Sequence, residues 1–345
     1  MDLEKIKNEL GGYDGPAMRI MEICGSHTEA VARFGIPSLI SDKITLLSGP
    51  GCPVCVTASA YIDRLIELGK NGKRIVTFGD LIRVPGSSMS LADAGSMGVR
   101  VDMVYSPKDV LGLAAAAPGD EFVFAAVGFE TTAPVYAMLI DEIVRERIKN
   151  VKLLTSLKTM PEVVMNMLDN GAPIDAFIAP GHVCVVTGYK VFEEAAKKHS
   201  IPFGVAGFGG EQIMTAIYGL TLMRGRGIVK NFYPAVVSRD GNTTAWEAVM
   251  RFFEKCDATW RGLGSIPDSG LVLRDEYLCY DAGSTGLDED VKKNSGCRCD
   301  EVLTGRLKPG ECPLFGRACS PMDPQGACMV SSEGSCHTYY VNAIR

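Results

Sequence analysis

Cysteine is the residue type in this 345-residue chain that could do chemistry, and its twelve copies are unevenly spread. Six of them crowd the C-terminal end: Cys297, Cys299, Cys312, Cys319, Cys328 and Cys336. A chain of this length can bury its own core and does not need disulfide staples. Thiols packed this densely at one end therefore indicate metal or redox chemistry.

The spacing of these cysteines favours an iron–sulfur cluster over zinc. Structural zinc sites usually carry two short Cys-x2–4-Cys pairs, whereas iron–sulfur clusters also take four thiolates but accept wider spacings. The predicted ligands of a 4Fe-4S cluster are Cys312, Cys319, Cys328 and Cys336, with Cys299 as a reserve. The alternative is that these are free structural thiols. Three isolated cysteines are predicted to be packing residues: Cys184, Cys256 and Cys279.

A first upstream motif combines a thiol with an imidazole, in the run Cys24-Gly25-Ser26-His27. We expect Cys24 at the end of a strand and just before a helix, where free N–H groups favour a thiolate. His27 lies three residues on, on the same helix face. The pair could bind a soft metal or supply a nucleophile. The alternative is an inert buried cysteine and a histidine that caps a turn.

A second upstream motif, Cys52-Pro53-Val54-Cys55, has the CxxC spacing and follows Gly-Pro-Gly. Its two sulfurs could bind one metal or close a reversible disulfide. A CxxC at a junction between a strand and a helix resembles a thiol–disulfide redox motif. The chain has no second CxxC to complete a zinc site, because Cys297-Arg298-Cys299 is too tight. The alternative is an accidental pair in a structural turn.

Two further polar residues are expected at strand ends, Glu130 in a Gly-Phe-Glu-Thr-Thr run and His182 in Pro-Gly-His-Val. Either could transfer a proton or hydrogen bond to a ligand. The alternatives are helix capping for Glu130 and a satisfied core hydrogen bond for His182. The glycine-rich turn 207–210 could hold an anion, but it lacks the dinucleotide fingerprint.

The elements that must position these residues alternate between short apolar runs and helical stretches, which predicts an α/β fold. The predicted strands are 18–23, 44–47, 74–78, 101–105, 122–127, 151–156, 175–179 and 203–206. The predicted helices are 60–68, 135–147, 161–168, 189–198 and 211–222, and a further helical stretch at 244–253 follows. Ligands bind at the carboxyl ends of parallel strands, so the motifs should line one rim or cleft.

The favoured architecture has two open, mainly parallel α/β domains, although eight units could also close a single barrel. The first would span 15–118 and carry Cys24 and the CxxC motif, and the second would span 119–228. A loop-rich iron–sulfur domain would follow at 229–345, with residues 1–14 as a candidate addition. A thin core of this kind can be held together by a metal centre.

The overall composition excludes several classes of function. The net charge is -6, with no basic excess that would indicate a nucleic-acid partner. The apolar runs fall short of the roughly 20 residues that span a bilayer, and residues 1–10 lack a signal-peptide core. These features predict a soluble cytoplasmic protein, in which thiols stay reduced.

Together the motifs resemble the HypD family, maturation proteins of nickel–iron hydrogenases. The matching runs are 21–28 (MEICGSHT), 49–55 (GPGCPVC), 128–134 (GFETTAP), 180–183 (PGHV), 312–316 (CPLFG) and 328–334 (CMVSSEG). They are spread over nearly the whole chain, and Ser26 departs from the threonine expected in many relatives.

The resemblance implies two α/β domains, a third domain with a 4Fe-4S cluster, and a scaffold on which the Fe(CN)2CO unit is assembled. Cys24 would be an iron ligand supported by His27, and a small HypC-type chaperone would share the iron. HypE would deliver cyanide made with HypF. Glu130 and His182 would shape the cleft.

On this hypothesis, Cys52 and Cys55 relay electrons between the cluster and the iron, so the protein is a metallocentre assembly scaffold with redox activity. The main alternative is an iron–sulfur thiol–disulfide oxidoreductase in which Cys24 is incidental. A structural zinc protein is a third possibility.

Overall fold

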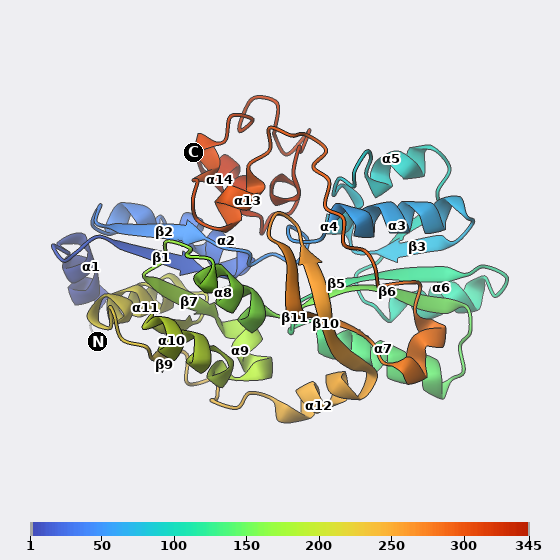
Figure 1. The fold of residues 1–345 in the computed structure, drawn as a ribbon, viewed down its shortest axis with the longest axis horizontal. Coiled ribbons are helices and arrows are strands. Elements are labelled where there is room, and N and C mark those ends of the chain that lie inside the picture. Colours follow the sequence, from blue (N-terminus) through green and yellow to red (C-terminus); the bar gives the residue numbers. More distant parts are fainter. Residues whose placement is uncertain (1–2, 344–345) are drawn as a thin grey trace.

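The computed structural model describes residues 3–343 and arranges them as two β-sheets flanked by helices. In Figure 1 the red C-terminal segment lies above the place where the two sheets meet, and the orange β10–β11 hairpin lies between them. Among residues 3–343, no helix combines the length and the apolar character that a bilayer span needs.

The first sheet contains five parallel strands in the order β2-β1-β7-β8-β9. Their bounds are β1 Met18–Glu22, β2 Ile44–Ser48, β7 Ala176–Pro180, β8 Phe203–Ala206 and β9 Val229–Asn231. Every residue of β7 and β8 is buried, which explains their continuous apolar sequences.

The second sheet contains six strands in the order β10-β11-β6-β5-β3-β4. Four of them are parallel, and β10 and β11 form an antiparallel hairpin that joins through β6. Their bounds are β3 Arg74–Thr77, β4 Val101–Met103, β5 Phe122–Gly128, β6 Val151–Lys158, β10 Phe253–Trp260 and β11 Gly264–Leu273.

The helices connect and cover these strands. Their bounds are α1 Leu3–Gly11, α2 Gly25–Arg33, α3 Ser59–Lys70, α4 Gly79–Ile82, α5 Leu91–Ser96, α6 Asp109–Ala116, α7 Ala133–Arg145, α8 Met160–Asp169, α9 Gly181–Thr187, α10 Glu193–His199, α11 Gly210–Leu222, α12 Thr243–Phe252, α13 Cys299–Leu303 and α14 Ser335–Ala343. The predicted helices are confirmed, with shifted ends.

All eight predicted strands are confirmed, but the β10–β11 hairpin was not foreseen. Two features of its sequence make the hairpin hard to recognise. Strand β10 alternates partly buried and exposed residues over 254–258, as a sheet edge does, and β11 is interrupted by Pro267 and Gly270. The region after 229 is therefore not only loop-rich, because part of it completes the second sheet.

The strand pairing does not follow the predicted division at 118 and 119. Strand β1 pairs with β7, and β3 pairs with β5, so each sheet takes strands from both predicted domains. Local periodicity shows that a strand exists but not which strand it pairs with.

The N-terminal residues do not join the C-terminal region as suggested for 1–14. Helix α1 buries Ile6 and Leu10 in the core of the first sheet. Residues 1–2 and 344–345 of the predicted domains lie outside the described residues.

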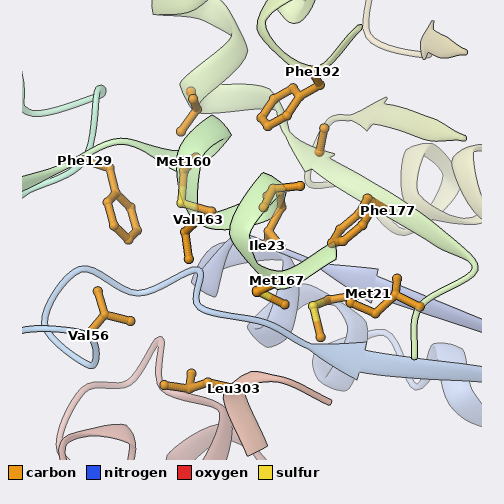
Figure 2. Packing of buried hydrophobic residues seen from close by; sticks show 14 of the residues in the cluster. Met21, Ile23, Val56, Phe129, Met160, Val163, Met167, Phe177, Phe192 and Leu303 are labelled. Atoms are coloured by element: carbon orange, nitrogen blue, oxygen red, sulfur yellow. The ribbon is translucent and has the colours of Figure 1, made fainter. Parts of the chain in front are cut away.

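One apolar core joins the two sheets to the C-terminal region. Figure 2 shows that the cluster includes Phe177 of β7 and Ile23, which follows β1, as well as Met160 and Phe129, which follow strands of the second sheet. Leu303 of α13 belongs to the same cluster. The strand ends that carry the motifs are therefore held against one another by shared packing.

Candidate metal and thiol centre

Cys24 begins helix α2 directly after strand β1, as the sequence predicts. Its backbone is extended, with φ of −151° and ψ of 123°, and its N–H donates to Oε2 of Glu22 at 3.0 Å. The N–H of Gly25 donates to the carbonyl oxygen of Gly51 at 3.0 Å. A Cβ at position 51 would collide with the backbone of Cys24, so only glycine lets the second motif pack on the first.

The charge state of Cys24 differs from the expected thiolate. Burial and the nearby Glu22 raise the pKa of the Cys24 thiol to about 12, and the N–H groups of His27 and Ser26 only partly oppose this. The helix N-terminus lowers the pKa of the Cys24 thiol by less than the removal of water raises it. The thiol keeps its proton at neutral pH, and a bound soft metal cation would take that proton's place.

His27 connects α2 to the turn that follows strand β8 of the first sheet. The ring is fully buried, with 0% exposure, and its Nε2 lies 3.0 Å from the carbonyl oxygen of Gly207. It stacks on Phe208 at 4.6 Å between ring centroids, and Phe208 also stacks on His182 at 4.0 Å. Burial lowers the pKa of His27 to about 4, so the imidazole is neutral.

These contacts bring together Cys24, His27, His182 and the glycine-rich turn at 207–210, as expected for motifs on one rim. His182 is exposed, so the alternative of a core histidine does not apply. The ring of His27 bonds to the Gly207 turn, and we infer that it supports Cys24 by holding α2 in place.

Glu333 is a site residue to which the sequence analysis gave no role. The hydroxyl of Ser26 donates to Oε1 of Glu333 at 3.0 Å, and a Cβ on Gly25 would collide with the Glu333 side chain. Its charge contributes to the raised pKa of Cys24. The available signal was its place in the matching run 328–334, but only the fold brings it over α2.

The C-terminal segment is held to both sheets. The hydroxyl of Ser331 donates to Oδ2 of Asp80 at 3.3 Å, and Arg83 donates to the carbonyl oxygen of Pro321 at 2.8 Å. Both partners lie at α4, which follows a strand of the second sheet, whereas Ser26 belongs to α2. These contacts position the C-terminal cysteines beside the upstream motifs.

Cys52 and Cys55 are both buried, and no disulfide joins them in the described structure. The N–H of Cys55 donates to Sγ of Cys52 at 3.3 Å. Burial and hydrogen bonds with the thiols of Cys328 and Cys52 raise the pKa of Cys55 well above its usual value. The dithiol is therefore in direct contact with a C-terminal cysteine.

The six C-terminal cysteines line one cavity of about 20 Å³. Sγ of Cys55 donates to the carbonyl oxygen of Ala327, the neighbour of Cys328, at 3.9 Å. The thiols of Cys55, Cys299 and Cys328 lie close enough to influence one another's pKa, so the dithiol adjoins this cavity.

The donor set fits an iron–sulfur cluster, because its donors are thiols and more than the four needed are present. Position 326 must be small, since a Cβ on Gly326 would come within 2.7 Å of Sγ of Cys297. Within 3–343, no group of three or more His, Cys, Asp or Glu residues is placed to hold a single metal ion.

Glu130 does not join this centre. It lies in a separate cavity of about 310 Å³, where its Oε1 accepts the N–H of Met160 at 2.8 Å. It thus caps α8, as the alternative interpretation proposed. Cys184 is fully buried, as expected for packing, and this burial raises its pKa, with smaller contributions from Glu130 and Cys24.

Glu130 predicts a specific dependence of stability on pH. Burial raises the pKa of Glu130 from 4.5 to about 8, so the folded state holds a proton that the unfolded state releases above pH 4.5. Stability from this group is complete below pH 4.5 and is lost as the pH rises through 8. Glu130→Gln should match the wild type at pH 4.5 and exceed it by up to about 5 kcal/mol at pH 9.

Melting temperatures of the wild type and of Glu130→Gln, measured by circular dichroism between about pH 4.5 and pH 9, check the prediction. Glu142→Gln should give a curve parallel to the wild type, because the Lys108 partner lowers the pKa of this partly exposed α7 carboxyl and keeps it ionised across the range. Parallel curves for Glu130→Gln would contradict it.

Comparison with known proteins gives consistent matches. A family model described as HypD, hydrogenase formation hypA family, matches residues 2–343. "Hydrogenase maturation factor HypD" of Rhodobacter capsulatus is 39% identical over 350 residues, covering 98% of this chain and 93% of the relative. The protein of the same name from Cupriavidus necator is 38% identical over 343 residues, covering 94% and 90%. That of Escherichia coli is 39% identical over 332 residues, covering 94% and 88%.

Proposed function

The chain belongs to the HypD family of hydrogenase maturation factors, and from this premise we propose that it is the scaffold on which the Fe(CN)2CO unit of nickel–iron hydrogenase is assembled. The observation that carries the proposal is the position of the buried Cys52 and Cys55 beside the cavity that the six C-terminal cysteines line. The proposal places the protein in the cytoplasm, where these thiols stay reduced.

Cys24 is the proposed protein ligand of the iron cargo, and a HypC-type chaperone would share that iron. The Cys24 side chain is 9% exposed and its backbone is fixed by Glu22 and Gly51, so the thiol is held in one place. A thiolate is a suitable ligand for soft, low-spin iron. HypE, with HypF, would supply the cyanide.

The cavity cysteines Cys312, Cys319, Cys328 and Cys336 are proposed to hold a 4Fe-4S cluster, with Cys299 in reserve. Bound there, the cluster would supply single electrons. Cys52 and Cys55 would store two electrons as a dithiol and release them, with two protons, when their sulfurs join in a disulfide. His182 and Glu333 would line the approach to Cys24.

A thiol–disulfide oxidoreductase remains the second candidate, because the buried dithiol beside a cysteine cavity would serve it equally. The scaffold and the oxidoreductase differ in whether the protein carries an iron unit with bound cyanide and carbon monoxide. We expect the protein, purified anaerobically with a HypC-type chaperone, to show infrared bands of bound cyanide and carbon monoxide. Turnover of a disulfide substrate without such bands would favour the oxidoreductase.

Variants of the cavity cysteines test the ligand set. Alanine at Cys312, Cys319, Cys328 or Cys336 should abolish the cluster, because a 4Fe-4S cluster needs all four thiolates. Iron and sulfide analysis and absorption near 400 nm, under anaerobic conditions, measure this outcome. Cys279→Ala is the matched control, since Cys279 is exposed and outside the cavity.

Cys297→Ala should also keep the cluster, although Cys297 lines the same cavity. Full retention in one of the four named variants would transfer that ligand role to Cys299.

A further inference from the structure

The cavity at Glu130 has features that capping of α8 does not explain. It lies where the end of β5, the first turn of α8 and helix α12 meet, and encloses about 310 Å³. Its lining includes none of the cysteines of the thiol centre. We refer to it as the Glu130 cavity.

Three side-chain oxygens in this cavity have no hydrogen-bond partner within the described part of the chain. They are Oε2 of Glu130, Oγ1 of Thr159 and Oε2 of Glu162. Glu130 is 1% exposed and Thr159 is 2% exposed, so bulk water does not satisfy these oxygens. A buried polar group left unpaired is destabilising, and a ligand with matching donors would remove that cost.

The charges around the cavity indicate the sign of that ligand. Both lysines that line it already have partners: Lys255 pairs with Oε1 of Glu162 at 2.5 Å, and Lys190 with Asp240 at 2.8 Å. Glu130 and Glu162 are close enough for each charge to be felt by the other. At neutral pH the proton that Glu130 holds removes the repulsion between the two carboxyl groups, and a cation bound between them would take that proton's place.

The free atoms also indicate the shape of the ligand. Two acceptors on separate carboxyl groups, with a hydroxyl beside them, suit a planar group that carries several N–H donors. Trp246 lines the same cavity, and an indole is the best aromatic partner for a cation. A guanidinium has both the planar fork of donors and the ability to stack on a ring.

We propose that the Glu130 cavity binds a guanidinium group between Glu130 and Glu162, with Thr159 as a third contact. The group belongs either to a small free molecule or to an arginine of a partner protein. This site is separate from the iron site and does not depend on the proposed assembly function.

Titration of the purified full-length protein with millimolar methylguanidinium chloride tests the proposal, with tryptophan fluorescence as the readout. Trp246 lines the cavity, whereas Trp260, the other tryptophan, is fully buried in the core and provides a constant background. We expect a saturable change with methylguanidinium. Tetramethylammonium at the same ionic strength should bind much more weakly, because it can lie on the Trp246 ring but has no N–H donors for the carboxyl groups.

Variants locate the binding. Glu130→Gln and Glu162→Gln should each weaken binding by about tenfold or more, since a charged hydrogen bond is lost. Glu142→Gln on the surface of α7 should bind like the wild type, and so should Cys24→Ser, which leaves this cavity unchanged. If Glu130→Gln does not fold, the titrations of Glu162→Gln and of the wild type still show whether the Glu130 cavity binds a guanidinium.

Equal affinity in the wild type and both cavity variants, or a change that does not saturate, would overturn the proposal. A blocked tripeptide with a central arginine distinguishes the two sources. Tighter binding of the peptide than of methylguanidinium indicates a partner's arginine, and weaker binding indicates a free small molecule.

Discussion

Replacing Cys24 with serine is expected to abolish loading of the iron unit, with a loss of at least about 100-fold. Removing even an outer contact of a metal ligand costs about 10–100-fold in affinity, and here the ligand itself is lost. Serine keeps the size of the side chain and the N–H bond to Glu22, so the fold should survive. Its hydroxyl is a hard donor that keeps its proton, and it is a poor ligand for soft iron.

Infrared bands of cyanide and carbon monoxide on anaerobically purified protein measure this effect, together with hydrogenase activity in cells. Cys184→Ser is the matched control, because Cys184 is buried near Cys24 but does not line the C-terminal cavity. We expect it to keep the bands. Normal bands in Cys24→Ser would exclude Cys24 as the iron ligand and favour the oxidoreductase.

Replacing Cys55 with alanine is expected to abolish hydrogenase maturation while leaving the cluster in place. Cys55 lies beside Ala327 and Cys328, and a single remaining cysteine cannot form a disulfide. The lost sulfur leaves only a small cavity, so stability should fall by about 1–2 kcal/mol. Maturation activity and absorption near 400 nm, measured on the same preparation, separate the two effects.

The two cysteines of the motif should behave as one unit. Cys52→Ala should match Cys55→Ala, and the double variant should be no worse than either single change. Cys279→Ala, at an exposed thiol, should be fully active. A fully active Cys55→Ala variant would exclude the dithiol relay and leave Cys52 and Cys55 with a structural role.

Much of the fold was predictable because its strands are short, apolar and buried on both faces. Strands β5 and β7 show this best, since all their residues are buried and their sequences are continuously apolar. Strand β11 was not predictable, because Pro267 and Gly270 interrupt its pattern and its partner β6 lies far away in the chain. Pairing between distant strands depends on packing that no local pattern records.

The candidate site also has features that the sequence predicts and features that only the fold decides. By itself the sequence determined which residues carry chemistry and that Cys24 precedes a helix, because strand ends, glycine turns and CxxC spacing are local properties. Tertiary structure alone decided that Glu333 lies over α2, that Cys55 touches Cys328, and that Glu130 lies in a cavity of its own.

The tertiary structure also decided the protonation state of the Cys24 thiol. A helix N-terminus favours a thiolate, but the pKa depends on how much water the folded chain removes and on which carboxylate it places nearby. Both are set by residues distant in the chain, so they appear only once the chain has folded.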